Sequence, residues 1–447
     1  MAYRFQKAAI IGGSFAGLWT ARVLSDFFEE VVILERDSLP ESPKTRPGVP
    51  QDLQVHILLE RGAEIMSALF PNIGEELTAA GANYIDLTEK MHVYSRGIWL
   101  DRFESGHCTY ACSRLLLEDI VRRRVKALPN VTFQEQTRVL NLIHHDGQVQ
   151  GVNVSRKGTE ANTHVFADFV VDASGYGSKT THWLTGLGYS SVDETVIDSQ
   201  TGYASRRFHL SPHQNIDWHM MMIPTEPGYH ERGGFVYHEE NGRWIATLNG
   251  MMGDYPPTDE AGFDAFAKDV GPEFYQFVTE AQPISAIRGF RGMANVWRHF
   301  EKMPAWPDRL IVVGDAVCRL NPIYGQGMSV SAMAAEALLR QFEKWDSTLD
   351  DFAWSFQRRY PKIIDVPWLL ASSSDQEWLG NIENQSVIER VAGWYFPKLL
   401  EALPHERAIA EAFVEIQNLK RSPAILFSPQ MMWYALKHQL QSGQPQA

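Results

Sequence analysis

The sequence predicts an α/β protein in which a domain with a parallel sheet contains an inserted antiparallel-sheet domain and is followed by a helical C-terminal region. Three observations predict this fold class: an apolar strand, helix and strand pattern at the N-terminus, a series of short β-rich segments in the middle of the chain, and a mainly helical pattern after Asp350. The chain has 447 residues, which is long enough for two or three domains with buried cores.

The N-terminal pattern predicts a β-α-β unit. A short buried strand is expected over Lys7–Gly12, a helix over Ala16–Phe27 and a second apolar strand of the parallel type over Glu30–Glu35. Helical periodicity also extends over Leu53–Phe70 and Arg114–Leu128, and a proline follows each of these stretches.

Short β-rich segments predict further sheets. A small meander that returns to the main sheet is predicted by Val131–Phe133, Val139–Ile143, Val149–Val154 and Val165–Val171. Tyr203–Gly250 again favours strands, which predicts a second, sheet-rich domain. A late strand over Leu310–Val313 leads through a glycine-rich loop into a helix over Met328–Trp345.

Composition and charge exclude several classes of function. The formal net charge of -13 opposes non-specific attraction to nucleic acid or anionic lipid, so we expect no nucleic-acid partner. No HExxH motif and no other spacing typical of a metal site is present, so no metal centre is expected. The sequence has no apolar run of about 18 residues and no secretory signal at its start. We therefore expect a soluble, cytoplasmic protein in which Cys108, Cys112 and Cys318 are reduced thiols.

A glycine-rich loop after the first predicted strand indicates a dinucleotide site. The loop consists of Gly12, Gly13, Ser14, Phe15, Ala16 and Gly17. It follows a strand and opens a helix, as a nucleotide pyrophosphate requires when it rests on backbone N–H groups at a helix N-terminus. Glu35 ends the second strand about 20 residues further on, where an acidic side chain accepts hydrogen bonds from ribose hydroxyls.

A second motif, late in the chain, favours FAD as the dinucleotide. Gly314–Val317 (GDAV) follows a strand, and a single Rossmann unit that binds NAD has no use for it. Together with Val171–Gly175 (VDASG) and the N-terminal loop, it resembles the three-part fingerprint of the aromatic-hydroxylase superfamily of FAD monooxygenases. The resemblance implies a Rossmann-like FAD-binding domain of the glutathione-reductase type.

The same resemblance implies contacts to the flavin end of FAD. Asp315 would bind the ribitol or its neighbouring hydroxyls, and the loop Asn321–Met328 would place backbone N–H groups at the N1 and O2 edge of the flavin. The residues of this loop expected at the flavin are Pro322, Gly325, Gly327 and Met328.

A narrower resemblance covers most of the chain, from about residue 8 to 340. Its segments are the N-terminal loop, Leu34–Pro40, Gly48–Gln51 with His56, Ser113–Glu118, Asp172–Ser178, Gly253–Thr258 and Asn321–Ser329. Their order and spacing resemble the flavin-dependent epoxidases of polyether-ionophore pathways.

This narrower resemblance implies further cofactor contacts. Arg114 would reach the FAD phosphates or the adenosine side from its helix, and Glu35 with Arg36 would hold the adenosine ribose. Gln51 and His56 would lie near the isoalloxazine ring. For His56 the alternative is a hydrogen-bonded histidine within a helix.

The motifs and the strand pattern divide the chain into three expected parts. The FAD-binding domain is discontinuous and comprises residues 1–85, 108–182 and 285–348. The substrate-binding β-sheet domain comprises residues 86–107 and 183–284, and residues 349–447 form the helical C-terminal region. Several apolar side chains of the second domain are expected either to line a pocket for a long apolar substrate or to pack in the core of that domain. They are Met220, Met221, Met222, Phe235, Tyr237, Trp244, Met251 and Met252.

The resemblance implies an FAD-dependent monooxygenase that uses NAD(P)H and O2. NAD(P)H would reduce FAD, O2 would form a hydroperoxide at flavin C4a, and oxygen would pass to an apolar small molecule by epoxidation or hydroxylation, in secondary metabolism. One alternative is a reductase or dehydrogenase of isoprenoid double bonds, and another is a flavin-binding protein without turnover. Halogenation is disfavoured because the Trp-x-Trp-x-Ile-Pro segment of flavin halogenases is missing. The sequence assigns neither a catalytic residue nor an oligomeric state.

Overall fold

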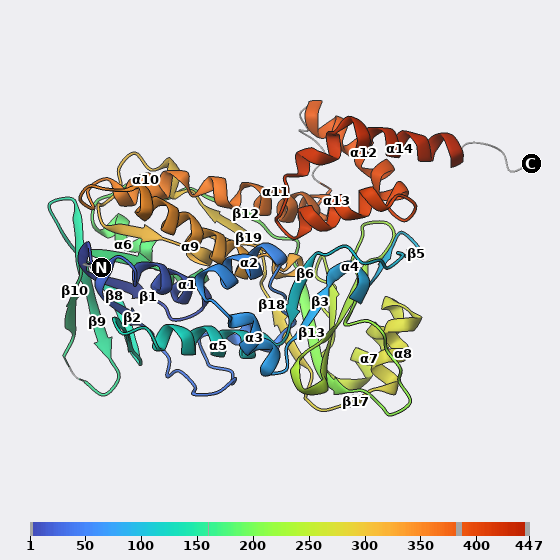
Figure 1. The fold of residues 1–447 in the computed structure, drawn as a ribbon, viewed down its shortest axis with the longest axis horizontal. Helices are drawn as coiled ribbons and strands as arrows, with labels where there is room; N and C mark the ends of the chain where they lie inside the picture. The colour runs from blue at the N-terminus through green and yellow to red at the C-terminus, as the bar shows by residue number, and fades with distance from the viewer. Residues whose placement is uncertain (1–2, 160, 381–386, 443–447) are drawn as a thin grey trace, which may run out of the picture.

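The main sheet lies on the left of the view in Figure 1. The computed structural model describes residues 3–159, 161–380 and 387–442. The sheet has five parallel strands in the order β20-β11-β1-β2-β7. Its strands are β1 (Phe5–Ile11), β2 (Phe28–Leu34), β7 (Val131–Gln134), β11 (Phe169–Asp172) and β20 (Leu310–Val312). The predicted α/β class with a parallel sheet is confirmed.

Helices cover the strands and explain their apolar sequences. Helix α1 (Phe15–Leu24) connects β1 and β2 and is buried along most of its length. Helix α9 (Gly327–Lys344) packs against α1 and against α2 (Glu60–Leu69), and α5 (Arg114–Lys126) also packs against α1. Because α9 follows the late glycine-rich loop, its packing on α1 brings that loop to the N-terminal one.

The predicted meander is confirmed except for its first segment, Val131–Phe133, which forms β7 of the main parallel sheet. The meander is an antiparallel sheet with the order β10-β9-β8, formed by β8 (Thr137–His145), β9 (Gln148–Arg156) and β10 (Thr163–Phe166). Asp146 (φ 48°) and Gly147 (φ 79°) form the turn between β8 and β9, as expected for a two-residue hairpin loop. The segment predicted as one strand, Val165–Val171, divides into the end of β10 and the start of β11.

The prediction of a helix over Leu53–Phe70 is wrong for the residues before Glu60. Residues Pro50–Leu53 form a 3₁₀ helix, and the backbone is then extended at Gln54 (ψ 169°) and again at Leu59 (ψ 156°), so that α2 begins only after Leu59. The backbone N–H of Leu59 donates to the Ser329 hydroxyl of α9 (3.0 Å). A tertiary hydrogen bond thus overrides the local helical pattern.

The second sheet has the strand order β17-β13-β16-β15-β14-β4-β5, and β18 also pairs with β13. Its strands are β4 (Met91–Ser95), β5 (Ile98–Trp99), β13 (Gly202–His209), β14 (Met220–Ile223), β15 (Arg232–His238), β16 (Arg243–Gly250), β17 (Gln282–Pro283) and β18 (Arg288–Arg291). Helices α7 (Glu260–Val270) and α8 (Pro272–Glu280) complete its core. Because β18 pairs with β13, this sheet extends to residue 291, beyond the boundary expected at residue 284.

Smaller elements lie between the two sheets. The short strands are β3 (Asn83–Asp86), β6 (Cys108–Ala111), β12 (Glu194–Ile197), β19 (Asn295–Arg298) and β21 (Cys318–Arg319). The short helices are α3 (Ile73–Ala79), α4 (Leu87–Lys90) and α6 (Thr180–Gly186). Among the 3₁₀ helices, Gly175–Gly177, Gly314–Ala316 and Pro322–Tyr324 belong to the predicted cofactor motifs.

The C-terminal region is helical, as predicted. Its helices are α10 (Phe352–Arg359), α11 (Pro361–Trp378), α12 (Val387–Ala402), α13 (Arg407–Gln417) and α14 (Pro429–Ser442). Helix α11 leads from the main domain to α12, α13 and α14, which have a core of their own around Leu399, Ile409 and Ile416 (Figure 1). Residues 381–386 and 443–447 of this region lie outside the described residues.

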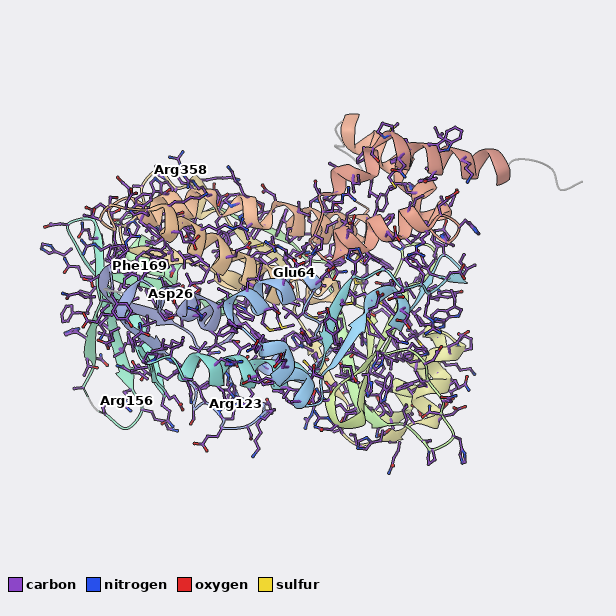
Figure 2. All side chains as sticks on the ribbon, in the orientation of Figure 1. Asp26, Glu64, Arg123, Arg156, Phe169 and Arg358 are labelled. Atoms are coloured by element: carbon purple, nitrogen blue, oxygen red, sulfur yellow. The ribbon has the colours of Figure 1, made fainter. Side chains whose placement is uncertain are left out.

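Apolar side chains of the strands and helices are buried in the core, and many charged side chains lie on the surface. Phe169 of β11 is fully buried in the main core, whereas Arg123 and Arg358 lie on the surface (Figure 2). In the described ranges, no helix combines the length and the apolar character needed to cross a bilayer.

Candidate functional site

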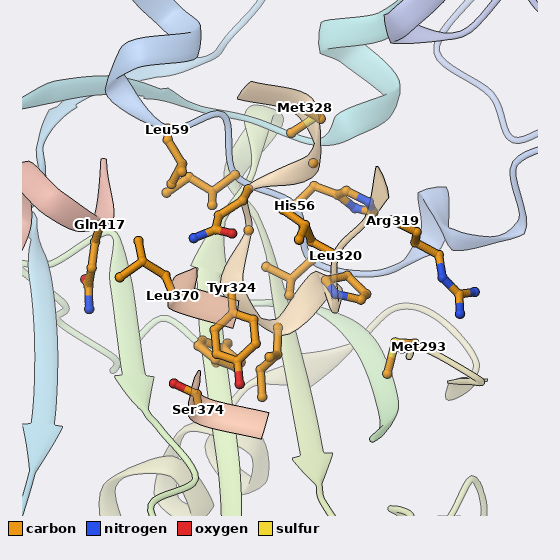
Figure 3. Close-up of a pocket in the computed structure, with 18 of the residues that line it drawn as sticks. His56, Leu59, Met293, Arg319, Leu320, Tyr324, Met328, Leu370, Ser374 and Gln417 are labelled. Atoms are coloured by element: carbon orange, nitrogen blue, oxygen red, sulfur yellow. The ribbon is translucent and has the colours of Figure 1, made fainter. Parts of the chain in front are cut away.

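A cavity of about 2070 Å³ lies where the main sheet, the second sheet and the C-terminal helices meet (Figure 3). Pockets for single small molecules measure about 300–1,000 Å³, so this cavity has room for a dinucleotide and a second molecule. The predicted site residues that line it are Gly12, Gly13, Ser14, Phe15, Ala16, Glu35, Arg36, Gln51, His56, Arg114, Asp315, Pro322, Gly325, Gly327 and Met328. Gly17 does not line it.

The glycines of the first loop allow close packing of the backbone. Gly12 has a φ of 102°, and a Cβ there would lie 2.6 Å from the carbonyl oxygen of Ala173. A Cβ on Gly17 would lie 1.9 Å from the carbonyl oxygen of Gly12. Gly17 therefore serves the packing of α1 against the loop, which is the role of the last glycine in this motif.

The N-terminus of α1 is open toward the cavity. Ser14 is the N-cap residue, but its hydroxyl makes no capping hydrogen bond. Instead it donates to Glu118 Oε2 (3.0 Å) and accepts from Arg114 Nη2 (2.8 Å). The first-turn N–H groups of α1 thus have no side-chain acceptor among the described residues, and such groups bind phosphate oxygens in nucleotide sites.

The three predicted motifs meet at one edge of the main sheet. A Cβ on Gly314 (φ 63°) would lie 2.8 Å from the Cβ of Ala16, so the late loop touches the first one. In the middle motif, the buried carboxylate of Asp172 accepts hydrogen bonds from the hydroxyls of Ser174 (2.5 Å) and Thr180 (2.6 Å). These bonds fix the turn that follows β11 against the first loop.

The late loop presents a second helix N-terminus to the cavity. Gln326 is the N-cap of α9 and makes no capping bond, and its buried Oε1 has no hydrogen-bond partner among the described residues. Asp315 lines the cavity beside this helix start. Burial raises the pKa of Asp315, although the positive charge of Arg319 acts in the opposite direction. An open helix end and an unpartnered amide oxygen fit a site built around a polar ligand.

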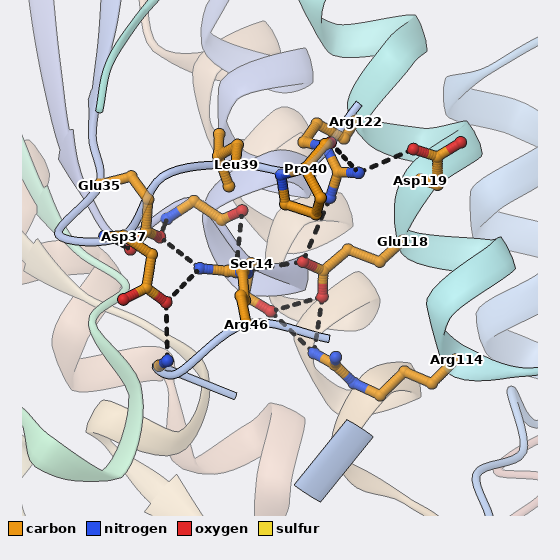
Figure 4. Close-up of polar contacts among 12 residues, drawn as sticks. Ser14, Glu35, Asp37, Leu39, Pro40, Arg46, Arg114, Glu118, Asp119 and Arg122 are labelled. Atoms are coloured by element: carbon orange, nitrogen blue, oxygen red, sulfur yellow. Dashed lines mark hydrogen bonds and ion pairs between the residues drawn. The ribbon is translucent and has the colours of Figure 1, made fainter. Parts of the chain in front are cut away.

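A buried ion-pair network surrounds the first loop, and Arg46 lies at its centre (Figure 4). Arg46 Nη1 lies 3.0 Å from Glu35 Oε2, and Nη2 lies 3.1 Å from Glu118 Oε1. Glu35 also accepts a hydrogen bond from the Gly13 N–H (2.8 Å). Burial acts to lower the pKa of Arg46, but the charges of Glu118 and Glu35 raise it overall. Arg46 was not among the predicted site residues, because it lies in an irregular segment with no periodic signal.

Arg114 enters the same network from the first turn of α5. Its Nη2 lies 2.8 Å from Glu118 Oε2, and both side chains are 6% exposed. Burial acts to raise the pKa of Glu118, but the charges of Arg114 and Arg46 lower it overall, so the carboxylate is ionised. Arg36, in contrast, is exposed and donates to the carbonyl of Gly48 (3.2 Å).

His56 lies in the irregular segment before α2, so the alternative of a helix histidine is wrong. Its Nδ1 lies 3.0 Å from the carbonyl oxygen of Gln54. Burial and the charge of Arg114 lower the pKa of His56 to about 3, so the ring is neutral at neutral pH. Gln51 lies in the preceding 3₁₀ helix and lines the same side of the cavity.

The other walls of the cavity are mainly apolar. The second sheet contributes Met91, Met220, Met222, Phe235 and Tyr237, and the C-terminal helices contribute Leu370, Phe396, Leu400, Phe413 and Phe427. Met221 and Trp244 pack instead in the core of the second sheet, and Met252 is exposed. Alternate residues of β14 therefore line the cavity, because successive side chains of a strand point to opposite faces.

The described residues form neither a metal site nor a disulfide bond. Within the described part of the chain, no group of three or more His, Cys, Asp or Glu residues is placed to hold a metal ion. Cys108, Cys112 and Cys318 are all free.

Comparisons with known proteins show the family of this chain. The family described as "FAD binding domain" matches residues 6–344. Protein Rv3254 of Mycobacterium tuberculosis (strain ATCC 25618 / H37Rv) is 31% identical over 448 residues, which cover 97% of this chain and 94% of that protein.

Solved structures share the fold. The flavin-dependent brominase Bmp2 has a TM-score of 0.65 at 13% identity, with 97% of this chain and 99% of that chain covered. PqsL, described as a probable FAD-dependent monooxygenase from Pseudomonas aeruginosa, has a TM-score of 0.63 at 17% identity (85% and 99% covered). The tetrameric form of 2-methyl-3-hydroxypyridine-5-carboxylic acid oxygenase also has a TM-score of 0.63 at 17% identity (85% and 94% covered). With the family match over most of its length, the chain belongs to the FAD binding domain family and is a flavoprotein.

Proposed function

We propose that the protein is an FAD-dependent monooxygenase that uses NAD(P)H and O2 to oxidise an apolar small molecule. The observation that carries the proposal is the arrangement of α1 and α9, whose N-termini lack side-chain caps and face one cavity with otherwise apolar walls. Bound FAD would supply electron transfer from NAD(P)H and activation of O2. The protein's own residues would bind the cofactor, orient the substrate and exclude water.

The adenosine half of FAD fits the first loop and its ion-pair network. The uncapped N–H groups at the start of α1 would receive the pyrophosphate. Glu35 would accept hydrogen bonds from the adenosine ribose, with Arg46 holding its carboxylate in place, and Arg36 would lie on the adenosine side. Arg114 has N–H groups beyond those bonded to Ser14 and Glu118, and these would reach the phosphates.

The flavin half fits the late loop. Asp315 would bind the ribitol hydroxyls, and the backbone of Pro322 to Met328 would lie along the N1 and O2 edge. The positive end of the α9 dipole favours negative charge on the reduced cofactor. His56 is uncharged at neutral pH and, with Gln51, would contribute hydrogen bonds near the ring without adding a charge.

The apolar part of the cavity would hold the substrate. Methionine side chains such as Met220 and Met222 are flexible and polarizable, so they adapt to long or irregular apolar molecules. Epoxidation of an alkene in secondary metabolism, as in the polyether-ionophore epoxidases that the sequence resembles, is one form of the reaction. Hydroxylation of an electron-rich ring is the other.

The decisive experiment measures cofactor and oxygen together. The purified protein is expected to show a flavin spectrum and to couple NAD(P)H oxidation to O2 consumption. With a panel of apolar alkenes and phenols, one atom of ¹⁸O2 should enter the product. Anaerobic hydrogenation of an isoprenoid double bond would instead indicate a reductase, and a flavin that NAD(P)H cannot reduce would indicate binding without turnover. Halogenated products that depend on added halide would indicate a halogenase, so each of these results contradicts the proposal.

A further inference from the structure

The C-terminal helices expose large apolar side chains to the cavity. Phe396 of α12 is 41% exposed and Phe427 of the 3₁₀ helix Pro423–Phe427 is 46% exposed, and both line the cavity. Phe413 of α13 and Leu400 of α12 line it as well. We call Phe396, Leu400, Phe413 and Phe427 the C-terminal wall. Exposed apolar side chains that gather in one place mark a binding surface, whereas scattered ones are common.

Contacts within the C-terminal helices hold the members of the wall next to one another. The rings of Phe396 and Phe413 lie 5.7 Å apart, measured between their centroids. Tyr395, the residue before Phe396, is buried and lies 5.5 Å from the Phe427 ring. Its hydroxyl donates a hydrogen bond to the carbonyl oxygen of Leu426 (2.7 Å), which fixes the 3₁₀ helix on α12. The wall is therefore one continuous apolar surface.

Polar contacts tie the C-terminal helices to the rest of the molecule. The backbone N–H of Glu60 donates to Asn418 Oδ1 (3.0 Å), and Lys420 Nζ lies 3.5 Å from Glu60 Oε1. Arg407 Nη2 donates to the carbonyl oxygen of Glu104 (2.8 Å). None of these contacts involves the C-terminal wall. They place the wall at the cavity and leave its apolar surface available to a ligand.

The same cavity connects the wall to the late loop. Leu370 of α11 lines the cavity and packs both against the main core and against the core of the C-terminal helices. Figure 3 shows Leu370 between Tyr324 of the late loop and Gln417 of α13. A ligand can therefore reach from the loop proposed to contact the flavin, past Leu370, to the C-terminal wall.

The size and chemistry of this space favour an extended hydrocarbon. A cofactor that filled about 1,000 Å³, the upper end for single small molecules, would leave about 1,000 Å³ of the 2070 Å³ cavity. Met91 and Met222 of the second sheet line the same cavity, so the occupant must fit inside it. The wall offers no charged or hydrogen-bonding side chain, and the reach past Leu370 favours a long molecule over a compact one.

We propose that the substrate carries a long hydrocarbon chain that lies on the C-terminal wall, while the group to be oxidised lies at the late loop. This inference rests on the proposed monooxygenase function and names the substrate class for it. Each methylene that leaves water for such a wall raises affinity by up to about fourfold. Phe396 and Phe427 are therefore specificity-determining residues, which select substrates by chain length and take no part in the oxidation itself.

The test uses the FAD-loaded protein and a series of 4-alkylphenols with ethyl, butyl, hexyl and octyl chains. Isothermal titration calorimetry gives the dissociation constant and the number of sites for each probe. Phe396→Gln and Phe427→Gln each place a polar side chain in the wall, and both rings are partly exposed, so the fold should tolerate the changes. Trp433→Gln is the matched control, because Trp433 is 60% exposed on α14 and does not line the cavity.

In the wild type and in Trp433→Gln, affinity is expected to rise about twofold to fourfold per methylene from the ethyl to the octyl probe, at a single site. In Phe396→Gln and Phe427→Gln the affinity for octylphenol should fall about tenfold or more, because apolar contact with the chain is lost. Affinity for ethylphenol and flavin content should stay at the wild-type level, since the short probe does not reach the wall.

The inference is overturned if both wall variants keep the chain-length dependence of the wild type. It is also overturned if the wild type binds octylphenol no better than ethylphenol, or binds neither. The binding series uses neither NAD(P)H nor O2, so a failure of the proposed function is seen separately. In that case the holoprotein would show the chain-length dependence but would not couple NAD(P)H oxidation to O2 consumption.

Discussion

Replacing Arg46 by methionine tests the ion-pair network that holds the first cofactor loop. Methionine fills a similar volume but removes the charge. In the described residues Arg46 is the ion-pair partner of Glu35, and it also contacts Asp37 (3.3 Å) and Glu118 (3.1 Å). The variant would leave the Glu35 carboxylate buried without a cation, at 5% exposure of its side chain.

The expected loss of folding stability in Arg46→Met is large because the removed side chain is buried. Breaking a buried ion pair from one side costs about 3–5 kcal/mol. Glu118 keeps Arg114 and Arg122 as partners, so most of the loss falls on Glu35. The matched control is Arg123→Met, since the Arg123 side chain is 57% exposed, and exposed pairs contribute about 0–1 kcal/mol.

The assay is urea denaturation followed by far-UV circular dichroism. All proteins carry saturating FAD, because a ligand that binds only the folded state adds to the apparent stability. Glu118 has a lowered pKa in the folded state, so its contribution is present above its unfolded pKa and is lost as pH falls through the folded pKa. In Arg46→Met the loss of stability between neutral and acidic pH should be smaller than in the wild type. A stability loss no larger than that of Arg123→Met, with an unchanged acid profile, would falsify the reasoning.

Three further predictions concern the cofactor loops. Gly17→Ala places a Cβ 1.9 Å from the Gly12 carbonyl oxygen and should cost about 1–3 kcal/mol of stability. Gly186→Ala, where nothing lies within 4 Å, should leave the thermal midpoint unchanged or raised. Equal midpoints for the two variants would contradict the expected clash at Gly17. Asp315→Ala should lose FAD, measured by the ratio of flavin to protein absorbance, while circular dichroism is unchanged; full flavin content would refute its assignment. His56 should show no NMR titration between pH 5 and 8, because its pKa is lowered to about 3. Its burial therefore makes stability fall as pH drops below the unfolded value of about 6.5, and a titration midpoint near that value would contradict this.

Local sequence patterns were sufficient to predict much of the fold. The strands β1 and β2, the helix α5 and the β8–β9 hairpin follow from apolar periodicity and from turn residues that constrain their own backbone. The three cofactor motifs were also visible, because each is a short backbone geometry that glycine or a small residue makes possible. Their joint use for one dinucleotide was implied by the resemblance of the three motifs to the fingerprint of FAD monooxygenases.

Other features depended on contacts between distant segments. The residues before α2 are extended because Leu59 bonds to Ser329 of α9, which no local pattern records. Arg46 gains its place in the buried network from its contacts with Glu35 and Glu118, which lie far from it in the sequence. The sequence by itself determined the FAD-binding fold and the glycine-rich loops that we propose bind the cofactor, because helix, strand and glycine signals act over a few neighbouring residues. The tertiary structure decided which buried carboxylates are paired with arginines, because that depends on which partners folding brings within a few ångströms.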